Sequence, residues 1–298
     1  MFYCTSSQNN TILFKKGRFF EKAIIVKQVR AKKNLGQHFL TDESIAERIA
    51  GSLTGMTDCL LEIGPGMGVL TKYLIKDNRY HFKVVELDRE SVEYLHDYYP
   101  ELEVIERDFL RLDLSKLFSS EANGGHKLSI IGNFPYNISS QILFRVFENR
   151  DMVPEVVGMF QKEVAERVAA GPGSKTYGIL SVLLSAFYNI EYLFTVHEHV
   201  FNPPPKVKSA VIRLTRNEVD SLGCDERLFV TVVKTAFNQR RKTMRNALKP
   251  LNCPLEAIGG DILSKRAEQL SVRDFVFITA TLQESLKNMV PVSEGDDE

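Results

Sequence analysis

The chain has 298 residues, of which 44% are hydrophobic, so it is long enough to bury a full core and to form a second small domain. Its four cysteines, at positions 4, 59, 224 and 253, show no paired spacing, which argues against a disulfide framework and a thiolate zinc site. The sequence lacks both an apolar run of 18 residues and the pattern of an export signal. We therefore expect a cytoplasmic protein with no metal and no membrane contact. A monomer is our expectation for the oligomeric state, which these features do not determine.

The net charge of zero hides two basic blocks. Residues 15–33 carry eight Lys or Arg against one Glu, and residues 234–249 carry six with no acid. A solvated face is as good an explanation of the first block as a functional arm. We expect residues 1–31 to be a disordered basic extension.

The residues that follow predict an alternation of helices and strands. A helix containing Ile45, Ile49 and Leu53 begins after Asp42, a residue suited to cap it. The alternation predicts a parallel sheet covered on both faces, the α/β doubly wound, Rossmann-like class. Strands are expected at 59–63, 82–86, 103–106, 128–132, 156–161, 192–196 and 210–215, and helices near 67–76, 89–97, 137–148 and 176–188.

Past Thr215 the apolar residues recur at helical spacing, as in Phe229, Val233 and Phe237. A small C-terminal helical domain is therefore expected. The predicted domains are 32–216 for the sheet and 217–298 for the helices, the latter ending in an acidic tail.

The first predicted strand leads into a glycine loop, Leu60-Leu-Glu-Ile-Gly-Pro-Gly-Met-Gly68. Doubly wound sheets bind nucleotides at such a place, because glycine lets the backbone approach a ligand and the next helix offers free amides. Gly64, Gly66 and Gly68 would form this surface. Taken alone, the loop could equally be a tight turn that serves strand–helix packing.

Two acids follow the next two strands. Glu86 lies about twenty residues after the glycines, where a carboxylate can bind ribose hydroxyls, and Asp108 could accept from an adenine amino group. The Gly-x-Gly-x-Gly spacing differs from that of dinucleotide enzymes, so it favours S-adenosylmethionine over NAD. Either acid could instead be an ordinary solvated residue at a strand end.

The fourth strand ends in Ile130-Ile-Gly-Asn-Phe-Pro-Tyr-Asn137. An adenine amine is a poor nucleophile because its lone pair is delocalised into the ring. Acceptors at Asn133 and at a carbonyl near Pro135 would favour a pyramidal nitrogen, while Tyr136 could stack on an extruded base. Phe201 is a second stacking candidate, although a hydrophobic loop anchor explains it equally well.

These motifs resemble the ribosomal RNA adenine dimethyltransferase family, in particular its small-subunit enzymes, over roughly residues 32–285. The resemblance implies a class I methyltransferase that transfers methyl groups from S-adenosylmethionine to the N6 amines of two adjacent adenines near the 3′ end of small-subunit rRNA, in an immature ribosomal subunit. It is carried by seven motifs: Asn34-Leu-Gly-Gln-His-Phe-Leu40, Glu62-Ile-Gly-Pro-Gly66, Val85-Glu-Leu-Asp88, Gly132-Asn-Phe-Pro-Tyr-Asn-Ile138, Gln161-Lys-Glu-Val164, Phe201-Asn-Pro-Pro-Pro-Lys-Val207 and Phe237-Asn-Gln-Arg-Arg-Lys-Thr243.

The resemblance also implies roles for single residues. His38 stands where this family often has Asn, so its exact contact is open. The second basic block would contact RNA phosphates through Arg240, Arg241, Lys242 and Arg245. The cofactor would contact His38, Leu40, Gly64, Gly66, Glu86, Asp108 and Asn133.

Two other functions remain open at this point. A sister type of enzyme methylates large-subunit rRNA and shares the glycine loop and the reaction motif. We disfavour it because the motif beginning at Gln161 and the motif beginning at Phe237 resemble the small-subunit enzymes. A non-catalytic assembly or transcription factor could use the same fold to bind nucleic acid, but the retained Glu86, Asp108 and Asn133 argue against it.

Overall fold

The computed structural model describes residues 15–16, 19–20, 29–118 and 127–289. Most of the predicted N-terminal extension and the acidic tail lie outside these residues. The expected disorder of residues 1–31 therefore stays a prediction.

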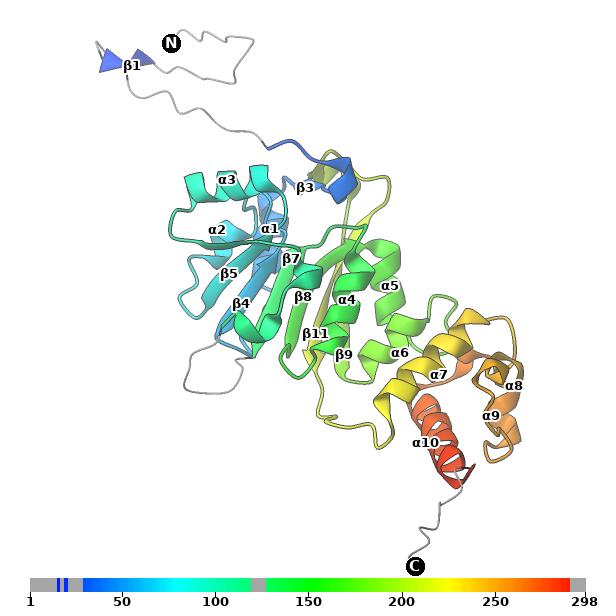
Figure 1. Ribbon diagram of the computed structural model, residues 1–298. Coiled ribbons are helices and arrows are strands. Elements are labelled where there is room, and N and C mark those ends of the chain that lie inside the picture. Colours follow the sequence, from blue (N-terminus) through cyan, green and yellow to red (C-terminus); the bar gives the residue numbers. More distant parts are fainter. Residues whose placement is uncertain (1–14, 17–18, 21–28, 119–126, 290–298) are drawn as a thin grey trace, which may run out of the picture.

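A seven-stranded sheet forms the centre of the protein, with strand order β6-β5-β4-β7-β8-β11-β9 (Figure 1). From β4 the chain adds β5 and then β6 on one side. It then returns to the other side of β4, where it forms β7 and β8 and the last two strands. The switch point therefore lies between the carboxyl ends of β4 and β7, where doubly wound sheets bind ligands. The strands are β4 (Cys59–Ile63), β5 (His81–Glu86), β6 (Glu103–Glu106), β7 (Leu128–Asn133), β8 (Glu155–Gln161), β9 (Tyr188–Val196) and β11 (Ser209–Arg216).

The expectation of a wholly parallel sheet is wrong at one strand. β11 pairs antiparallel with both β8 and β9, whereas β4, β5, β6, β7 and β8 pair in parallel. Only residues 197–208 join β9 to β11, and this connection has no crossover helix that could return the chain to the other end of the sheet. The sheet is therefore mixed, and the α/β class is confirmed.

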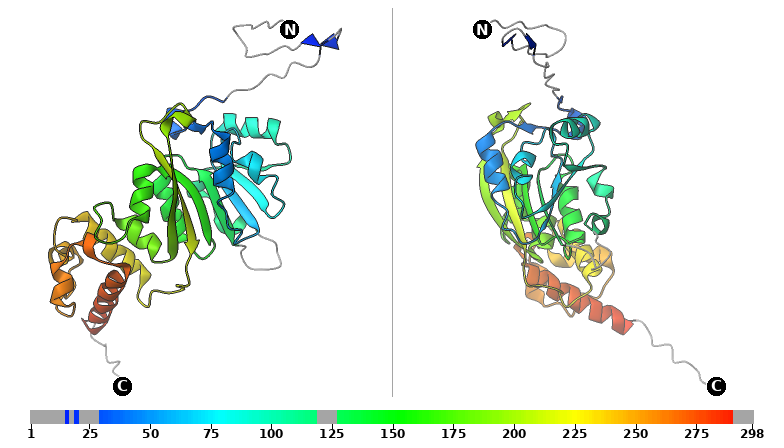
Figure 2. Two further views of the ribbon diagram at one scale, coloured as in Figure 1. Left: turned by 180° about the vertical axis from the view of Figure 1, so that it is seen from behind. Right: turned by 90° about the vertical axis from the view of Figure 1, so that its left-hand side faces the viewer.

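Helices cover both faces of the sheet (Figures 1 and 2). One face buries Leu60, Ile131 and Val157 under the first helices, and the other buries Ile130 and Val156 under the later ones. Asp42 caps the first helix by accepting a hydrogen bond from the Ile45 amide, as predicted. The helices on the first face are α1 (Glu43–Ala50), α2 (Thr71–Leu74) and α3 (Arg89–Tyr98), and those on the second are α4 (Ser139–Glu148), α5 (Lys162–Ala169) and α6 (Ile179–Ser185).

Short elements complete this part of the chain. β3 (Phe39–Leu40) pairs antiparallel with β10 (Phe201–Asn202), which joins the segment before α1 to the loop before β11. Two residue pairs link β1 (Lys15–Lys16) to β2 (Phe19–Phe20). The single-turn 3₁₀ helices are η1 (Lys33–Leu35), η2 (Phe109–Arg111), η3 (Leu114–Lys116) and η4 (Glu198–Val200).

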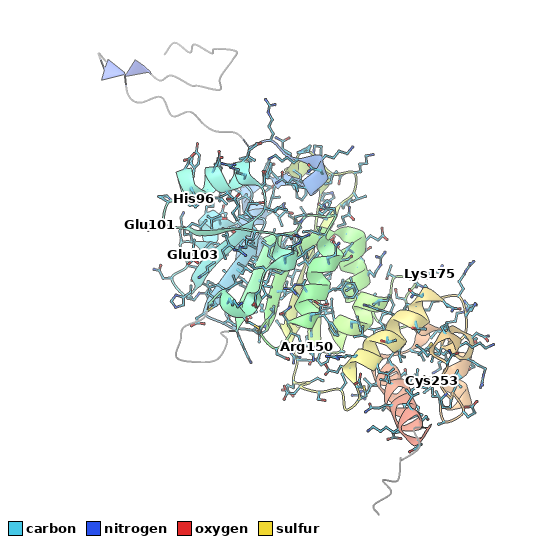
Figure 3. All side chains as sticks on the ribbon, in the orientation of Figure 1. His96, Glu101, Glu103, Arg150, Lys175 and Cys253 are labelled. Atoms are coloured by element: carbon cyan, nitrogen blue, oxygen red, sulfur yellow. The ribbon has the colours of Figure 1, made fainter. Side chains whose placement is uncertain are left out.

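The residues after β11 fold into helices, as their apolar spacing predicts. Phe229, Phe275 and Ile278 belong to the same hydrophobic cluster as the α4 side of the sheet. At this junction Arg150 forms an ion pair with Glu226 (Figure 3). The helices are α7 (Glu226–Asn238), α8 (Met244–Ala247), η5 (Lys249–Leu251), α9 (Gly260–Ser264), η6 (Ala267–Gln269) and α10 (Val272–Met289).

Candidate active site

Four consecutive parallel strands bring their carboxyl ends to one cavity of about 170 Å³. Its wall also includes the segment 35–39, which lies across the strand ends. Polar residues from four separate stretches of sequence therefore share one opening. The predicted site residues that line it are His38, Gly64, Gly66, Glu86, Asp108, Asn133, Pro135 and Tyr136.

The loop after β4 has a conformation that requires glycine. Gly64 and Gly66 have φ angles of 66° and 57°, in the left-handed region that disfavours other residues. A Cβ on Gly66 would lie 2.8 Å from the Phe39 ring. Both the backbone conformation and the space around it therefore favour the two glycines, and the backbone of the loop faces the cavity.

Glu86, the last residue of β5, is held in place by backbone amides. Its Oε1 accepts from the amides of Leu87 and Asp88, both at 2.8 Å, and its Oε2 accepts from the Gly66 amide at 3.1 Å. Burial raises the pKa of the Glu86 carboxyl, and these hydrogen bonds oppose that shift. A carboxylate has about four acceptor positions, so Oε2 keeps one for a hydroxyl donor in the cavity.

Asp108 lies at the start of η2. Its Oδ1 accepts from the Leu110 amide at 2.9 Å, and about a third of its side chain is exposed. Apart from Arg107, the lining residues around it in sequence are apolar, and Val85 and Leu87 add further apolar side chains to the cavity wall. A flat aromatic ring with an amino group fits these surroundings, because the walls are apolar and one edge offers an acceptor.

Asn133 ends β7, and its amide orientation is determined by its partner. Its Nδ2 donates to the His38 carbonyl at 2.9 Å. Because a carbonyl can only accept, the amide nitrogen must point to His38, and Oδ1 must point the other way. Within the described residues neither this oxygen nor the Phe134 carbonyl accepts a hydrogen bond, so both are available as acceptors.

The aromatic residues of this turn have opposite environments. Phe134 is 1% exposed and packs over Gly132 and Gly158, where a Cβ would lie 2.7 Å and 2.3 Å from its ring. Phe134 therefore anchors the turn in the core, a role that the sequence did not suggest. Tyr136 is only partly buried, and it lines the cavity, which Phe134 also borders.

Three contacts hold Tyr136 and its neighbour His38. The Tyr136 hydroxyl forms a hydrogen bond with Ser209 Oγ, at the first residue of β11. The His38 ring stacks on the Tyr136 ring with centroids 5.3 Å apart, and His38 Nδ1 donates to the Pro203 carbonyl at 2.7 Å. Burial raises the pKa of Tyr136, so its hydroxyl stays protonated.

Phe201 and Leu40 do not line this cavity. They face each other across the β3–β10 pair and are 3% and 4% exposed, within the core cluster under α1. This placement supports the hydrophobic-anchor interpretation of Phe201. Leu40 lines an adjoining pocket, which also contacts Gly64 and Asn133.

The sequence analysis gave no role to Glu62, a buried acid in the same adjoining pocket. Glu62 is 1% exposed and accepts a hydrogen bond from the Thr71 hydroxyl at 2.6 Å. Burial raises the pKa of its carboxyl to about 8. A single acid within the apolar run Cys59–Ile63 was the available signal.

The four predicted RNA-binding residues differ in their surroundings. Arg241, Lys242 and Arg245 are exposed. Arg240 is different, because its Nε donates to Glu268 at 2.7 Å and its Nη2 donates to the Lys175 carbonyl. Through this hydrogen bond, the loop that carries Lys175 contacts the C-terminal helical part of the chain (Figure 3).

Comparisons with known proteins agree with this geometry. A profile described as ribosomal RNA adenine dimethylase matches residues 28–260. The chain is 56% identical to a ribosomal RNA small subunit methyltransferase A of Bacteroides fragilis, over 90% of this chain and 98% of the relative. It is 59% identical to the protein of the same description in Cytophaga hutchinsonii, over 86% and 99% of the two chains.

Solved structures show the same fold. A dimethyladenosine transferase from Plasmodium falciparum has a TM-score of 0.65 and 27% identity, covering 81% of this chain and 96% of that one. The 23S rRNA methyltransferase ErmE has a TM-score of 0.60 and 24% identity, covering 81% and 99%. In the described part of the chain, no helix combines the length and the apolar character of a membrane span. The same residues contain no group of three or more His, Cys, Asp or Glu side chains that could hold a metal ion.

Proposed function

The chain belongs to the ribosomal RNA adenine dimethylase family, and from this premise we propose how its cavity dimethylates adenines of small-subunit rRNA with S-adenosylmethionine. The supporting observation is that Glu86, Asp108 and Asn133, from three separate strand ends, line one cavity. We further propose that residues 32–216 form the methyltransferase domain and residues 217–298 an RNA-binding helical domain. The chain would act as a cytoplasmic monomer on an immature subunit.

Residues of the cavity suit each part of the methyl donor. The free acceptor position on Glu86 Oε2 suits a ribose hydroxyl, and Asp108 suits the adenine amino group above apolar walls. The backbone at Gly64 and Gly66 lines the cavity, so it can approach the remaining part of the methyl donor. S-adenosylmethionine supplies a methyl group on a positively charged sulfur, which makes that carbon electrophilic.

The turn from Asn133 to Tyr136 activates and holds the target amine. Asn133 Oδ1 and the Phe134 carbonyl can accept the two hydrogens of the amine, which favours a pyramidal nitrogen and frees its lone pair for attack. The Tyr136 ring, fixed by Ser209, offers a surface for an extruded base. Rate then comes mainly from holding the reacting atoms in line.

Exposed cations in the turn after α7 and in α8 would bind the rest of the RNA. Arg241, Lys242 and Arg245 are free to contact phosphates, while Arg240 is engaged by Glu268. We therefore propose that Arg240 chiefly holds the basic block in position, through its bonds to Glu268 and to the Lys175 carbonyl. Phosphate contacts of this kind make affinity fall steeply as salt rises.

The relatives favour small-subunit over large-subunit rRNA. The two relatives that are 56% and 59% identical to this chain are described as small-subunit methyltransferases. The 23S rRNA methyltransferase is only 24% identical, so it supports the fold alone. We propose two adjacent adenines near the 3′ end as the targets. A non-catalytic role is disfavoured because the acceptor atoms of Asn133 and Glu86 are positioned and available.

The test is transfer of labelled methyl groups to three acceptors: immature small subunits, naked small-subunit rRNA and mature large subunits. We expect label in small-subunit rRNA, mapped by primer extension to adjacent adenines, and the highest rate with immature subunits. Label confined to large-subunit rRNA would end the assignment. Absence of transfer to every acceptor, with intact cofactor binding, would favour the non-catalytic role.

A further inference from the structure

The loop between β10 and β11 connects two parts of the reaction site. At its start the Pro203 carbonyl accepts from His38 Nδ1 at 2.7 Å, and at its end Ser209 Oγ bonds to the Tyr136 hydroxyl. His38 and Tyr136 both line the cavity and stack on each other. Residues 204–208 must therefore run along the edge of the place where a target base would enter.

This edge carries cations that the described residues do not neutralise. Lys206 and Lys208 are exposed, and neither forms an ion pair with a described residue. The Lys208 carbonyl accepts from the Lys162 amide at 2.9 Å, which places the amino end of α5 beside the loop. Lys162 itself has a loose, exposed contact with Glu166 at 3.4 Å, and exposed pairs of this kind are weak.

The acids of α5 do not cancel this charge. On α5, Glu163 already receives a hydrogen bond from Arg167 at 2.6 Å, and Glu166 is the acid shared with Lys162. Between the two lysines of the loop, Val207 is 46% exposed. The edge thus presents two free cations around an apolar residue.

The C-terminal basic block cannot replace this surface. The helices that carry it lie away from the end of the molecule where η1 meets the β10–β11 loop (Figures 1 and 2). Extruding a base costs a few kcal/mol of stacking, and contacts close to the extruded nucleotide help to offset that cost. Phosphates adjoining the target adenine need partners near the cavity itself.

We propose that Lys206 and Lys208, with Lys162 beside them, form an RNA phosphate-binding rim at the mouth of the cavity. Its partner is the sugar–phosphate backbone on either side of the target adenine. The proposal rests on the proposed function, because it assumes an RNA substrate at this cavity. It adds a second basic surface to the C-terminal block.

The test compares a rim variant, Lys206→Gln with Lys208→Gln, with a matched control, Lys116→Gln with Lys127→Gln. Both control lysines are exposed, and Lys127 comes directly before β7, at the opposite end of that strand from Asn133. Affinity for naked small-subunit rRNA is measured between about 50 and 200 mM salt. Two lost phosphate contacts should reduce the steepness of the log–log salt dependence by about 1.4 to 1.8.

S-adenosylmethionine binding, measured directly, should match that of the unaltered chain in both variants, which shows that the fold is intact. The paired change to arginine, Lys206→Arg with Lys208→Arg, should restore the steep salt dependence. A rim variant with the same salt dependence as the control would overturn the proposal. If the unaltered chain methylates only large-subunit rRNA, the proposed function fails, and the same comparison on that RNA still tests the rim.

Discussion

Removing the Ser209 hydroxyl should leave the Tyr136 hydroxyl without its partner. Ser209 is fully buried, and its Oγ is bonded to the half-buried Tyr136 hydroxyl. An unsatisfied buried hydroxyl costs about 1–3 kcal/mol. Because water can partly reach Tyr136, we expect the lower end for Ser209→Ala, a loss of about 1 kcal/mol in the free energy of unfolding.

A double-mutant cycle isolates this interaction. Denaturant unfolding is measured for the unaltered chain, Ser209→Ala, Tyr136→Phe and the double variant. The second change should cost little once the first is present, giving a coupling of about 1 kcal/mol. Ser209→Thr, which keeps a hydroxyl, should preserve more methyl transfer than Ser209→Ala. Additive losses, with no coupling, would refute the view that this bond holds Tyr136 in place.

Three further predictions concern catalysis, pH and RNA binding. Asn133→Ala should abolish methyl transfer while S-adenosylmethionine binding, measured by calorimetry, largely survives, because an amine acceptor is lost but Glu86 remains. Burial raises the pKa of Glu62 to about 8, so the folded chain holds a proton that the unfolded chain releases near pH 4.5. The free energy of unfolding should therefore fall between about pH 4.5 and 8, by up to about 1.4 kcal/mol per pH unit, and Glu62→Gln should lack this component. Arg240→Gln should lower the free energy of unfolding by about 1 kcal/mol, whereas Arg241→Gln should lower the salt dependence of RNA binding.

For each of these three predictions, one result would contradict the reasoning. Unchanged turnover in Asn133→Ala would remove its oxygen from the mechanism. An identical pH dependence for the unaltered chain and Glu62→Gln would mean that Glu62 is ionised in the fold. If Arg240→Gln reduced the salt dependence with no loss of stability, Arg240 would be a phosphate ligand and not a positioning residue.

The sequence predicted the main elements of the sheet closely. The strands at 59–63 and 103–106 have the predicted bounds, because short apolar runs bounded by turn residues are a local signal. Helix α5 was missed, and the expected helix at 67–76 is much shorter as α2 (Thr71–Leu74). Helix ends depend on capping and packing as well as on spacing.

The candidate site followed from the same local signals. Parallel strands place their carboxyl ends at one edge, so residues that follow β4, β5, β6 and β7 had to meet there. Eight predicted residues indeed line one cavity. The sequence could not show that Phe201 packs under α1 or that Arg240 is engaged by Glu268, because both contacts join distant segments.

The sequence by itself therefore determined where the strands lie along the chain and which residues follow them: the glycine loop, the two acids and the amide. Such features depend only on neighbours a few residues away. Tertiary structure alone decided that β11 runs antiparallel, that Phe134 points into the core while Tyr136 faces the cavity, and that His38 directs the oxygen of Asn133 away from its own carbonyl. The reason is physical: which face a side chain presents, and which partner it meets, is set by packing between segments that lie far apart in the chain.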